Sequence, residues 1–120
     1  MKTGFIGLGN VGGKLSGSLL RNGVDLTVFD LDNAPVRRLV GSGAKAGRNA
    51  ALMMHDCDVL ITCLPNPAAS ATVVEGPGGL LEGLSPGKIW MEMSTTDETE
   101  VKRLGAKVAA LGGMAVDCPV

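Results

Sequence analysis

Short apolar runs alternate with segments of helical period along the whole chain, and turn residues separate them. Residues 2–8 form the first apolar run, and residues 10–21 follow with apolar side chains at a four-residue spacing. Further strands are expected at 24–29, 44–46, 58–64, 88–93 and 114–118, and further helices at 33–40, 48–55, 67–75 and from 97 onward. Alternating strands and helices are typical of a parallel sheet covered on both faces. The pattern therefore predicts an α/β fold with a doubly wound, mainly parallel sheet in three layers.

Turn and capping residues lie at the expected ends of these helices. Asn22-Gly23 predicts the end of the first helix, because glycine adopts a left-handed backbone readily. Asn33 is expected to cap the second helix, whose first turn tolerates Pro35. Asp97 and Glu100 have the spacing of a capping box at the start of the last helix.

Length and composition limit the classes of function. A chain of 120 residues has the commonest size of a single domain, so one domain over residues 1–120 is expected. Eleven basic and twelve acidic residues give a net charge of −1, and the aromatic residues are two Phe and one Trp. A nucleic-acid partner is not expected, because neither a basic surface nor an aromatic stacking platform is available.

Cysteine and histidine content argues against a metal site. Three cysteines and one histidine occur without a zinc-ligand spacing, so no metal is expected and the thiols are expected to be reduced and mostly buried. No apolar stretch approaches the length of a membrane span, and the N-terminus lacks the pattern of a signal peptide. A cytoplasmic protein without membrane contacts is the expectation.

Glycine is unusually frequent, with 18 residues, and the six positions that close the first expected strand and open the first expected helix read GxGxxG. The motif is Gly7-Leu8-Gly9-Asn10-Val11-Gly12. In a strand–turn–helix context the first glycine permits a tight turn, the second lets a pyrophosphate approach, and the third allows close helix packing. Backbone amides around Asn10 and Val11 would then face the anion. The motif predicts a Rossmann-type dinucleotide site, the alternative being a plain glycine turn.

An acidic residue follows the second expected strand. Asp30 lies 18 residues after Gly12, where a carboxylate can accept hydrogen bonds from the adenosine ribose. Leu31 and Asp32 follow it, and the two carboxylates would repel a 2′-phosphate. NAD is therefore expected rather than NADP, although Arg37 and Arg38 are close enough in sequence for one of them to reach a phosphate.

The chain resembles the N-terminal domain of the β-hydroxyacid dehydrogenase family, which includes 3-hydroxyisobutyrate dehydrogenase and, more distantly, 6-phosphogluconate dehydrogenase. The resemblance covers essentially all 120 residues and rests on an ordered set of motifs. These are residues 4–12, Val28-Phe29-Asp30, residues 58–65, Gly78-Gly79-Leu80-Leu81, Met93-Ser94-Thr95-Thr96 and Asp117-Cys118-Pro119-Val120.

The resemblance assigns further residues to the cofactor. Leu64 and Pro65 would lie beside its adenosine half at the end of their strand, and Thr95 would lie near the nicotinamide. No contact is assigned to Ala69. Two departures stand out: no proline follows Thr95-Thr96, and Cys118 replaces a common alanine, which suggests a small buried residue. No residue of this chain is assigned a catalytic role.

The resemblance also implies what the full-length parent would do. It would transfer a hydride between NAD and a small 3-hydroxy acid, with a catalytic lysine in a helical second domain that also binds substrate and mediates homo-oligomer assembly. The Ser-Gly-Gly stretch and the lysine of the family have no counterpart in residues 1–120, so the chain alone is expected to bind NAD but to be inactive.

Two other readings stay open from the sequence. One is a free-standing module that senses NAD without catalysis. The other is an S-adenosylmethionine-binding domain, against which the third glycine, Gly12, and the Ser94-Thr95 strand end argue.

Overall fold

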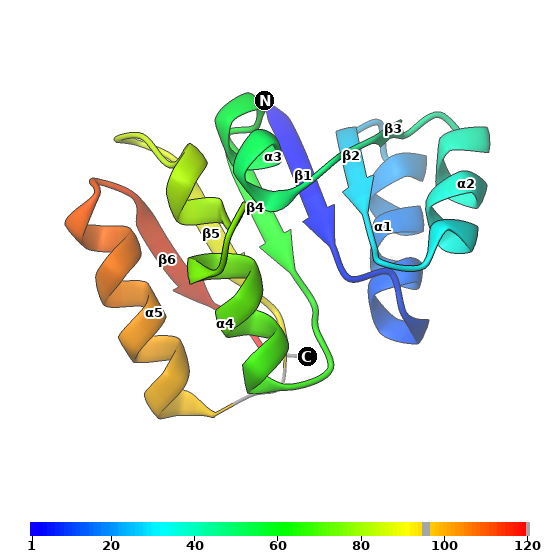
Figure 1. Cartoon of the computed structure of the whole chain (residues 1–120). Helices are drawn as coiled ribbons and strands as arrows, with labels where there is room; N and C mark the ends of the chain where they lie inside the picture. The colour runs from blue at the N-terminus through cyan, green and yellow to red at the C-terminus, as the bar shows by residue number, and fades with distance from the viewer. Residues whose placement is uncertain (95–96, 120) are drawn as a thin grey trace.

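The computed structural model describes residues 1–94 and 97–119 and shows a six-stranded parallel sheet with helices packed against it (Figure 1). The strands lie in the order β3-β2-β1-β4-β5-β6, and every adjacent pair is parallel. The elements, in chain order, are β1 (Lys2–Ile6), α1 (Asn10–Arg21), β2 (Asp25–Phe29), α2 (Asn33–Gly41), β3 (Lys45–Ala46), α3 (Ala50–Asp56), β4 (Val59–Thr62), α4 (Pro67–Glu75), the 3₁₀ helix η1 (Leu80–Gly83), β5 (Ile89–Glu92), α5 (Glu98–Ala110) and β6 (Met114–Asp117). The expected doubly wound parallel fold is confirmed.

The chain builds the sheet outward from its centre in two directions. From β1 it proceeds through β2 to β3, then returns across the sheet through α3 to β4, and continues through β5 to β6. Right-handed crossovers therefore place α1 and α2 on one face and α3, α4 and α5 on the other (Figure 1). The strand order reverses between β1 and β4, which makes their carboxyl ends the expected site of a ligand.

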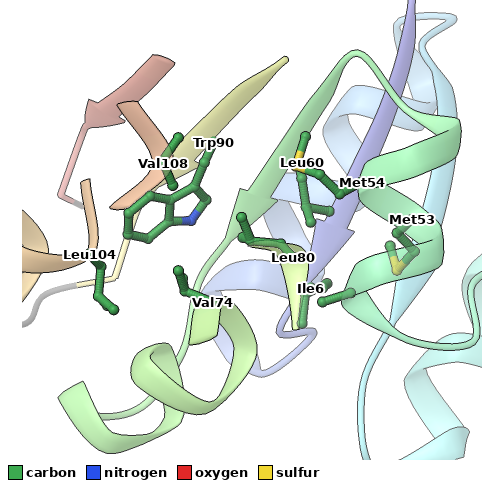
Figure 2. Packing of buried hydrophobic residues seen from close by; sticks show 10 residues of the cluster. Ile6, Met53, Met54, Leu60, Val74, Leu80, Trp90, Leu104 and Val108 are labelled. Atoms are coloured by element: carbon green, nitrogen blue, oxygen red, sulfur yellow. The ribbon is translucent and has the colours of Figure 1, made fainter. Parts of the chain in front are cut away.

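Two apolar clusters hold the layers together, one on each face of the sheet. The cluster beneath α3, α4 and α5 contains Trp90, which lies close to Leu104, Val108 and Leu80 (Figure 2). The other cluster joins α1 and α2 to β1, β2 and β4, with Phe5 and Val28 fully buried. Because the chain has so few aromatic residues, aliphatic and Met side chains supply most of both clusters.

Several expected boundaries and caps are wrong. β1 ends at Ile6 rather than at residue 8, so Gly7 and Leu8 belong to the turn. Asp32, not Asn33, caps α2, its carboxylate accepting from Ala34 N. Asp97 caps α5 as expected. The sequence pattern also missed η1, which is too short for a helical period to show.

The apolar side chains of α1 and α5 are buried only in part. In α1, Leu15 packs on the core whereas Val11 is half exposed. In α5, Leu104 and Val108 are buried, whereas Leu111, just after the helix, is exposed. Val11 belongs to the first turn of α1, and Leu111 is the C-cap residue that follows α5.

β6 is an edge strand of the described sheet, and its neighbourhood is open. It pairs with β5 alone, and three of its four residues are exposed. Cys118 follows it and is exposed, so the expectation that this thiol is buried is wrong. Cys57 is buried and Cys63 is partly buried. None of the helices in the described part of the chain is long and apolar enough to cross a membrane.

An ion-pair cluster connects α4 to α5. Glu75, the last residue of α4, accepts hydrogen bonds from Arg103 and Lys107 of α5, and Arg103 also pairs with Glu100. The hydrogen bonds from Arg103 and Lys107 lower the pKa of Glu75 to about 2 from its ordinary value of 4.5. The ionised carboxylate is therefore the form that the folded state favours.

Replacing Glu75 with Gln should remove a pH-dependent contribution to stability. Because the folded-state pKa is depressed, this contribution is present above pH 4.5 and disappears as the pH falls toward 2. Thermal unfolding of both proteins should show the wild type melting at a higher temperature near neutral pH and the difference closing below pH 4.5.

The matched control is Glu98→Gln, which breaks the exposed pair between Glu98 and Lys102 one turn away in α5. An isolated exposed pair at this spacing contributes little, so its melting temperature should stay near that of the wild type at every pH. Equal effects of the two substitutions would contradict the role assigned to Glu75.

Candidate dinucleotide site

A cleft of about 840 Å³ opens at the carboxyl ends of β1, β2 and β4, where the strand order reverses. Residues from the glycine motif, the end of β2, the end of β4 and α4 line it. The lining comprises Ile6, Gly7, Gly9, Asn10, Val11, Gly12, Phe29, Asp30, Leu31, Cys63, Leu64, Pro65, Ala69, Thr72, Val73 and Ser94. Nine of the expected site residues are among them, and a tenth, Leu8, lies in the same turn and is buried.

Gly7 and Gly12 form a close backbone contact at the start of this cleft. Gly7 has a φ of +100°, which a side chain would strain, and its amide donates to Phe29 O at 3.1 Å. A Cβ on Gly12 would lie 1.8 Å from Gly7 O, far inside van der Waals contact. The first turn of α1 therefore rests directly on the backbone of the preceding turn, as the third glycine of the motif requires.

The amino end of α1 is open toward the cleft. Gly9 is the N-cap residue and provides no side chain to cap the helix, and a Cβ placed there would meet no atom within 4 Å among the described residues. Asn10 and Val11, which follow it, also line the cleft. Free space beside backbone amides at a helix N-terminus is the arrangement that binds a phosphate group.

Asp30 has a structural function that the sequence did not reveal. Its Oδ2 accepts a hydrogen bond from Leu8 N at 2.6 Å, and its Oδ1 accepts one from Asp32 N at 2.9 Å. The carboxylate thus ties the glycine turn to the end of β2. Each oxygen keeps a further acceptor position, so Asp30 can still receive ribose hydroxyls.

The opposite wall comes from the loops after β4 and β5. Leu64 and Pro65 line the cleft as expected, and Leu64 N donates to Ser94 Oγ at 2.6 Å. This bond joins the two loops across the sheet. Thr95, the remaining expected site residue, lies outside the described residues.

Sequence reasoning missed the contribution of α4. Ala69, Thr72 and Val73 line the cleft, although no contact had been assigned to Ala69. The signal was available, because a helix that begins five residues after the end of a parallel strand starts at the same sheet edge. Cys63 also lines the cleft, and burial, with the nearby Glu92, raises the pKa of its thiol. The thiol therefore stays protonated and is a poor nucleophile.

A second groove, of about 890 Å³, runs between α1 and α2. Arg38 lines it together with Lys14, Arg21 and Asp32, and it shares Gly9 and Asn10 with the cleft. Arg38 thus faces the groove and does not line the cleft in which Asp30 and Leu31 lie.

These features together fit a dinucleotide. The cleft volume lies in the range of small-molecule and cofactor sites. Its glycine side offers the amides of a helix N-terminus that has no side-chain cap, the end of β2 offers a carboxylate, and the remaining lining is largely apolar. Within the described residues, no group of three or more His, Cys, Asp or Glu side chains gathers in a way that could hold a metal ion.

Comparison with known proteins agrees with this geometry. The sequence profile of the NAD binding domain of 6-phosphogluconate dehydrogenase matches residues 2–120. The chain belongs to this family. The family resemblance expected from the motifs is thereby confirmed, and with it an NAD(P)-binding domain of the hydroxyacid dehydrogenase type.

Two curated relatives show the range of proteins that carry this domain. The chain is 39% identical over 121 residues to 2-(hydroxymethyl)glutarate dehydrogenase of Eubacterium barkeri, covering 100% of this chain and 40% of the relative. It is 34% identical over 119 residues to the human cytokine-like nuclear factor N-PAC, covering 99% of this chain and 22% of that protein. The chain therefore spans less than half of either relative.

Solved structures give the same fold. Psf3 in complex with NADP⁺ and 2-OPP superposes with a TM-score of 0.93 at 28% identity, covering 98% of this chain and 42% of that one. The 3-hydroxyisobutyrate dehydrogenase of Mycobacterium tuberculosis, solved with L-serine, has a TM-score of 0.86 at 26% identity, covering 99% and 40%.

Gly12→Ala should destabilise the domain strongly, because the added methyl group meets backbone atoms of Gly7 that cannot move without breaking the turn. We expect a loss of about 2–4 kcal/mol in the free energy of unfolding. Urea denaturation followed by circular dichroism measures it.

Gly41→Ala in α2 is the matched control, since a Cβ there meets no described atom within 4 Å and its φ is not positive. Its stability should stay unchanged or rise by less than about 1 kcal/mol. If Gly12→Ala were as stable as Gly41→Ala, the close contact between α1 and the glycine turn would be refuted.

Proposed function

We propose that the chain is the NAD-binding domain of an oxidoreductase that transfers a hydride between NAD and a small 3-hydroxy acid, such as 3-hydroxyisobutyrate. The observation that supports this most directly is the open amino end of α1 facing a cleft that also contains Asp30. A family match over residues 2–120 and a dehydrogenase relative at 39% identity point the same way.

Each end of the cleft suits one part of the cofactor. The amides after Gly9 would bind the pyrophosphate, and the carboxylate of Asp30 would accept the adenosine ribose hydroxyls. Leu31 is 95% exposed at the rim, where an adenine ring would cover it. The nicotinamide half would then lie toward Leu64, Pro65 and Ser94, at the ends of β4 and β5, so Leu64 and Pro65 are proposed for this half and not for the adenosine half expected from the resemblance.

NAD is the proposed cofactor, in preference to NADP. The carboxylate of Asp30 lines the cleft and would repel a 2′-phosphate bound there, whereas Asp32 and Arg38 both line the neighbouring groove between α1 and α2. One solved relative is a complex with NADP⁺, so the choice depends on these residues and not on the fold.

In the proposed enzyme, the dinucleotide supplies hydride transfer and this domain holds it at the carboxyl edge of the sheet. The described site contains an unreactive thiol and carboxylates already held by backbone amides, so a general acid or base is not among its assigned residues. Substrate binding and proton transfer are proposed to lie outside residues 1–120.

A second candidate is a non-catalytic module whose NAD occupancy acts as a signal. The observation that favours it is the 34% identity to N-PAC, a protein that carries the name of a nuclear factor. Sequencing the reading frame that encodes this chain separates the two. A following Ser-Gly-Gly stretch with a lysine-bearing helical domain supports the dehydrogenase, and their replacement by unrelated sequence supports the module.

Calorimetric titration of the 120-residue chain should show tighter binding of NAD than of NADP. Asp30→Asn should narrow the ratio of the two dissociation constants by about tenfold, because it removes charge repulsion against the 2′-phosphate. It should also weaken the binding of both dinucleotides, since the Asp30 carboxylate holds the Leu8 amide.

Asp25→Asn is the control for the change in net charge, because Asp25 lies at the opposite end of β2 and pairs with Lys45. It should leave the ratio unchanged. Equal affinities for NAD and NADP in the wild type would contradict the proposed preference, and S-adenosylmethionine binding without dinucleotide binding would contradict the function itself.

A further inference from the structure

A buried hydrogen-bond network lies behind the wall of the cleft formed by Leu64 and Ser94. Thr62 and Glu92 are direct partners in the pairing of β4 with β5, and both side chains are fully buried. Trp90 Nε1 donates to Thr62 Oγ1 at 2.9 Å, and Thr62 Oγ1 donates to Glu92 Oε1 at 2.9 Å. Ser94 adds two donors to the same oxygen, its amide at 3.0 Å and its hydroxyl at 2.5 Å.

The direction of every bond in this network is determined by groups that can only donate. The indole N–H of Trp90 and the backbone N–H groups of Leu64 and Ser94 have no acceptor capacity. Trp90 therefore makes Thr62 Oγ1 an acceptor, and the Thr62 proton is left for Glu92. Leu64 N likewise makes Ser94 Oγ an acceptor, and the Ser94 proton is left for Glu92.

Glu92 Oε1 is consequently an acceptor in all of its contacts. It receives three donors, while Oε2 makes no hydrogen bond with any described residue. Even a proton on Oε2 would leave Oε1 accepting from the Ser94 hydroxyl. The one hydroxyl proton of Ser94 is therefore used in its hydrogen bond to Glu92 and is not available to a ligand in the cleft.

Ser94 is thus able to offer the cleft a lone pair but no proton. It lines the cleft and is only 2% exposed, so a ligand atom that reaches it leaves water. An acceptor facing it there would lose its hydrogen bonds to water without replacement, whereas a donor would be satisfied. The arrangement therefore discriminates between ligand groups by their hydrogen-bonding character.

We propose that Glu92 is a positioning residue that makes Ser94 an acceptor-only subsite, which takes a hydrogen-bond donor from the nicotinamide half of the dinucleotide. This rests on the proposed function, because the ends of β4 and β5 are the nicotinamide side only if a dinucleotide occupies the cleft. The donor is the carboxamide –NH₂ or a hydroxyl of the adjacent ribose.

Two analogues of NAD test these donors separately. In nicotinic acid adenine dinucleotide a carboxylate replaces the carboxamide, and in a deoxy analogue the nicotinamide ribose lacks a hydroxyl. Calorimetry on the wild-type chain should show at least one of them binding about tenfold more weakly than NAD, the usual penalty for an unmatched buried polar group.

Three variants then locate the origin of the penalty. Ser94→Ala removes the acceptor, and Glu92→Met removes the group that takes the Ser94 proton. Each of these two variants should therefore bind the analogue and NAD with nearly equal affinity. Glu92→Gln retains an oxygen at the position of Oε1 and should keep most of the penalty. Met54→Ala, a fully buried substitution in α3 that does not line the cleft, should lower stability and keep the penalty intact.

The outcomes separate the inference from the proposed function. If the wild type, Ser94→Ala and Glu92→Met show the same ratio of affinities for the analogue and NAD, the inference is overturned while dinucleotide binding stands. The inference is also overturned if Glu92→Gln loses the penalty to the same extent as Glu92→Met. Failure of the folded wild-type chain to bind any dinucleotide overturns the proposed function instead.

Discussion

The contact between the first turn of α1 and the carbonyl oxygen of Gly7 determines where everything else in the cleft lies. Without side chains at Gly7 and Gly12, the helix can begin directly against the end of β1. Its amino end then points along the carboxyl edge of the sheet. Asp30 secures the arrangement from the neighbouring strand by accepting the amide of Leu8. Together with the bond from Gly7 N to Phe29 O, this ties the turn to the end of β2.

The two sides of the cleft differ in hydrogen-bonding character as a result. The side formed by α1 presents amides that need an acceptor, which suits the charged bridge of a dinucleotide. On the side formed by β4 and β5, the amide of Leu64 is already satisfied by Ser94, and the hydroxyl of Ser94 is satisfied by Glu92. A ligand with an anionic centre and a donor-bearing end matches both sides at once.

The fold and the glycine side of the site could be predicted from sequence because their determinants are local. The strand–helix alternation and the spacing of Gly7, Gly9 and Gly12 are visible along the chain, and each has a steric reason. The hydrogen bond from Leu8 to Asp30 and the network around Glu92 join residues 22 and 30 positions apart. Glu92 lies between two methionines in an apolar strand, and the sequence does not indicate which residues will donate hydrogen bonds to its carboxylate. The exposure of Cys118 likewise depends on the strand order, which puts β6 at the edge of the described sheet.

The ion pairs of Glu75 concern the cleft as well as the helix that carries them. α4 contributes Ala69, Thr72 and Val73 to the lining, and its last residue is fastened to α5 by Arg103 and Lys107. Outward displacement of α4, which would widen the cleft, has to separate these charges. Since salt screens partly exposed charges, high ionic strength should weaken the attachment of this wall of the cleft to α5.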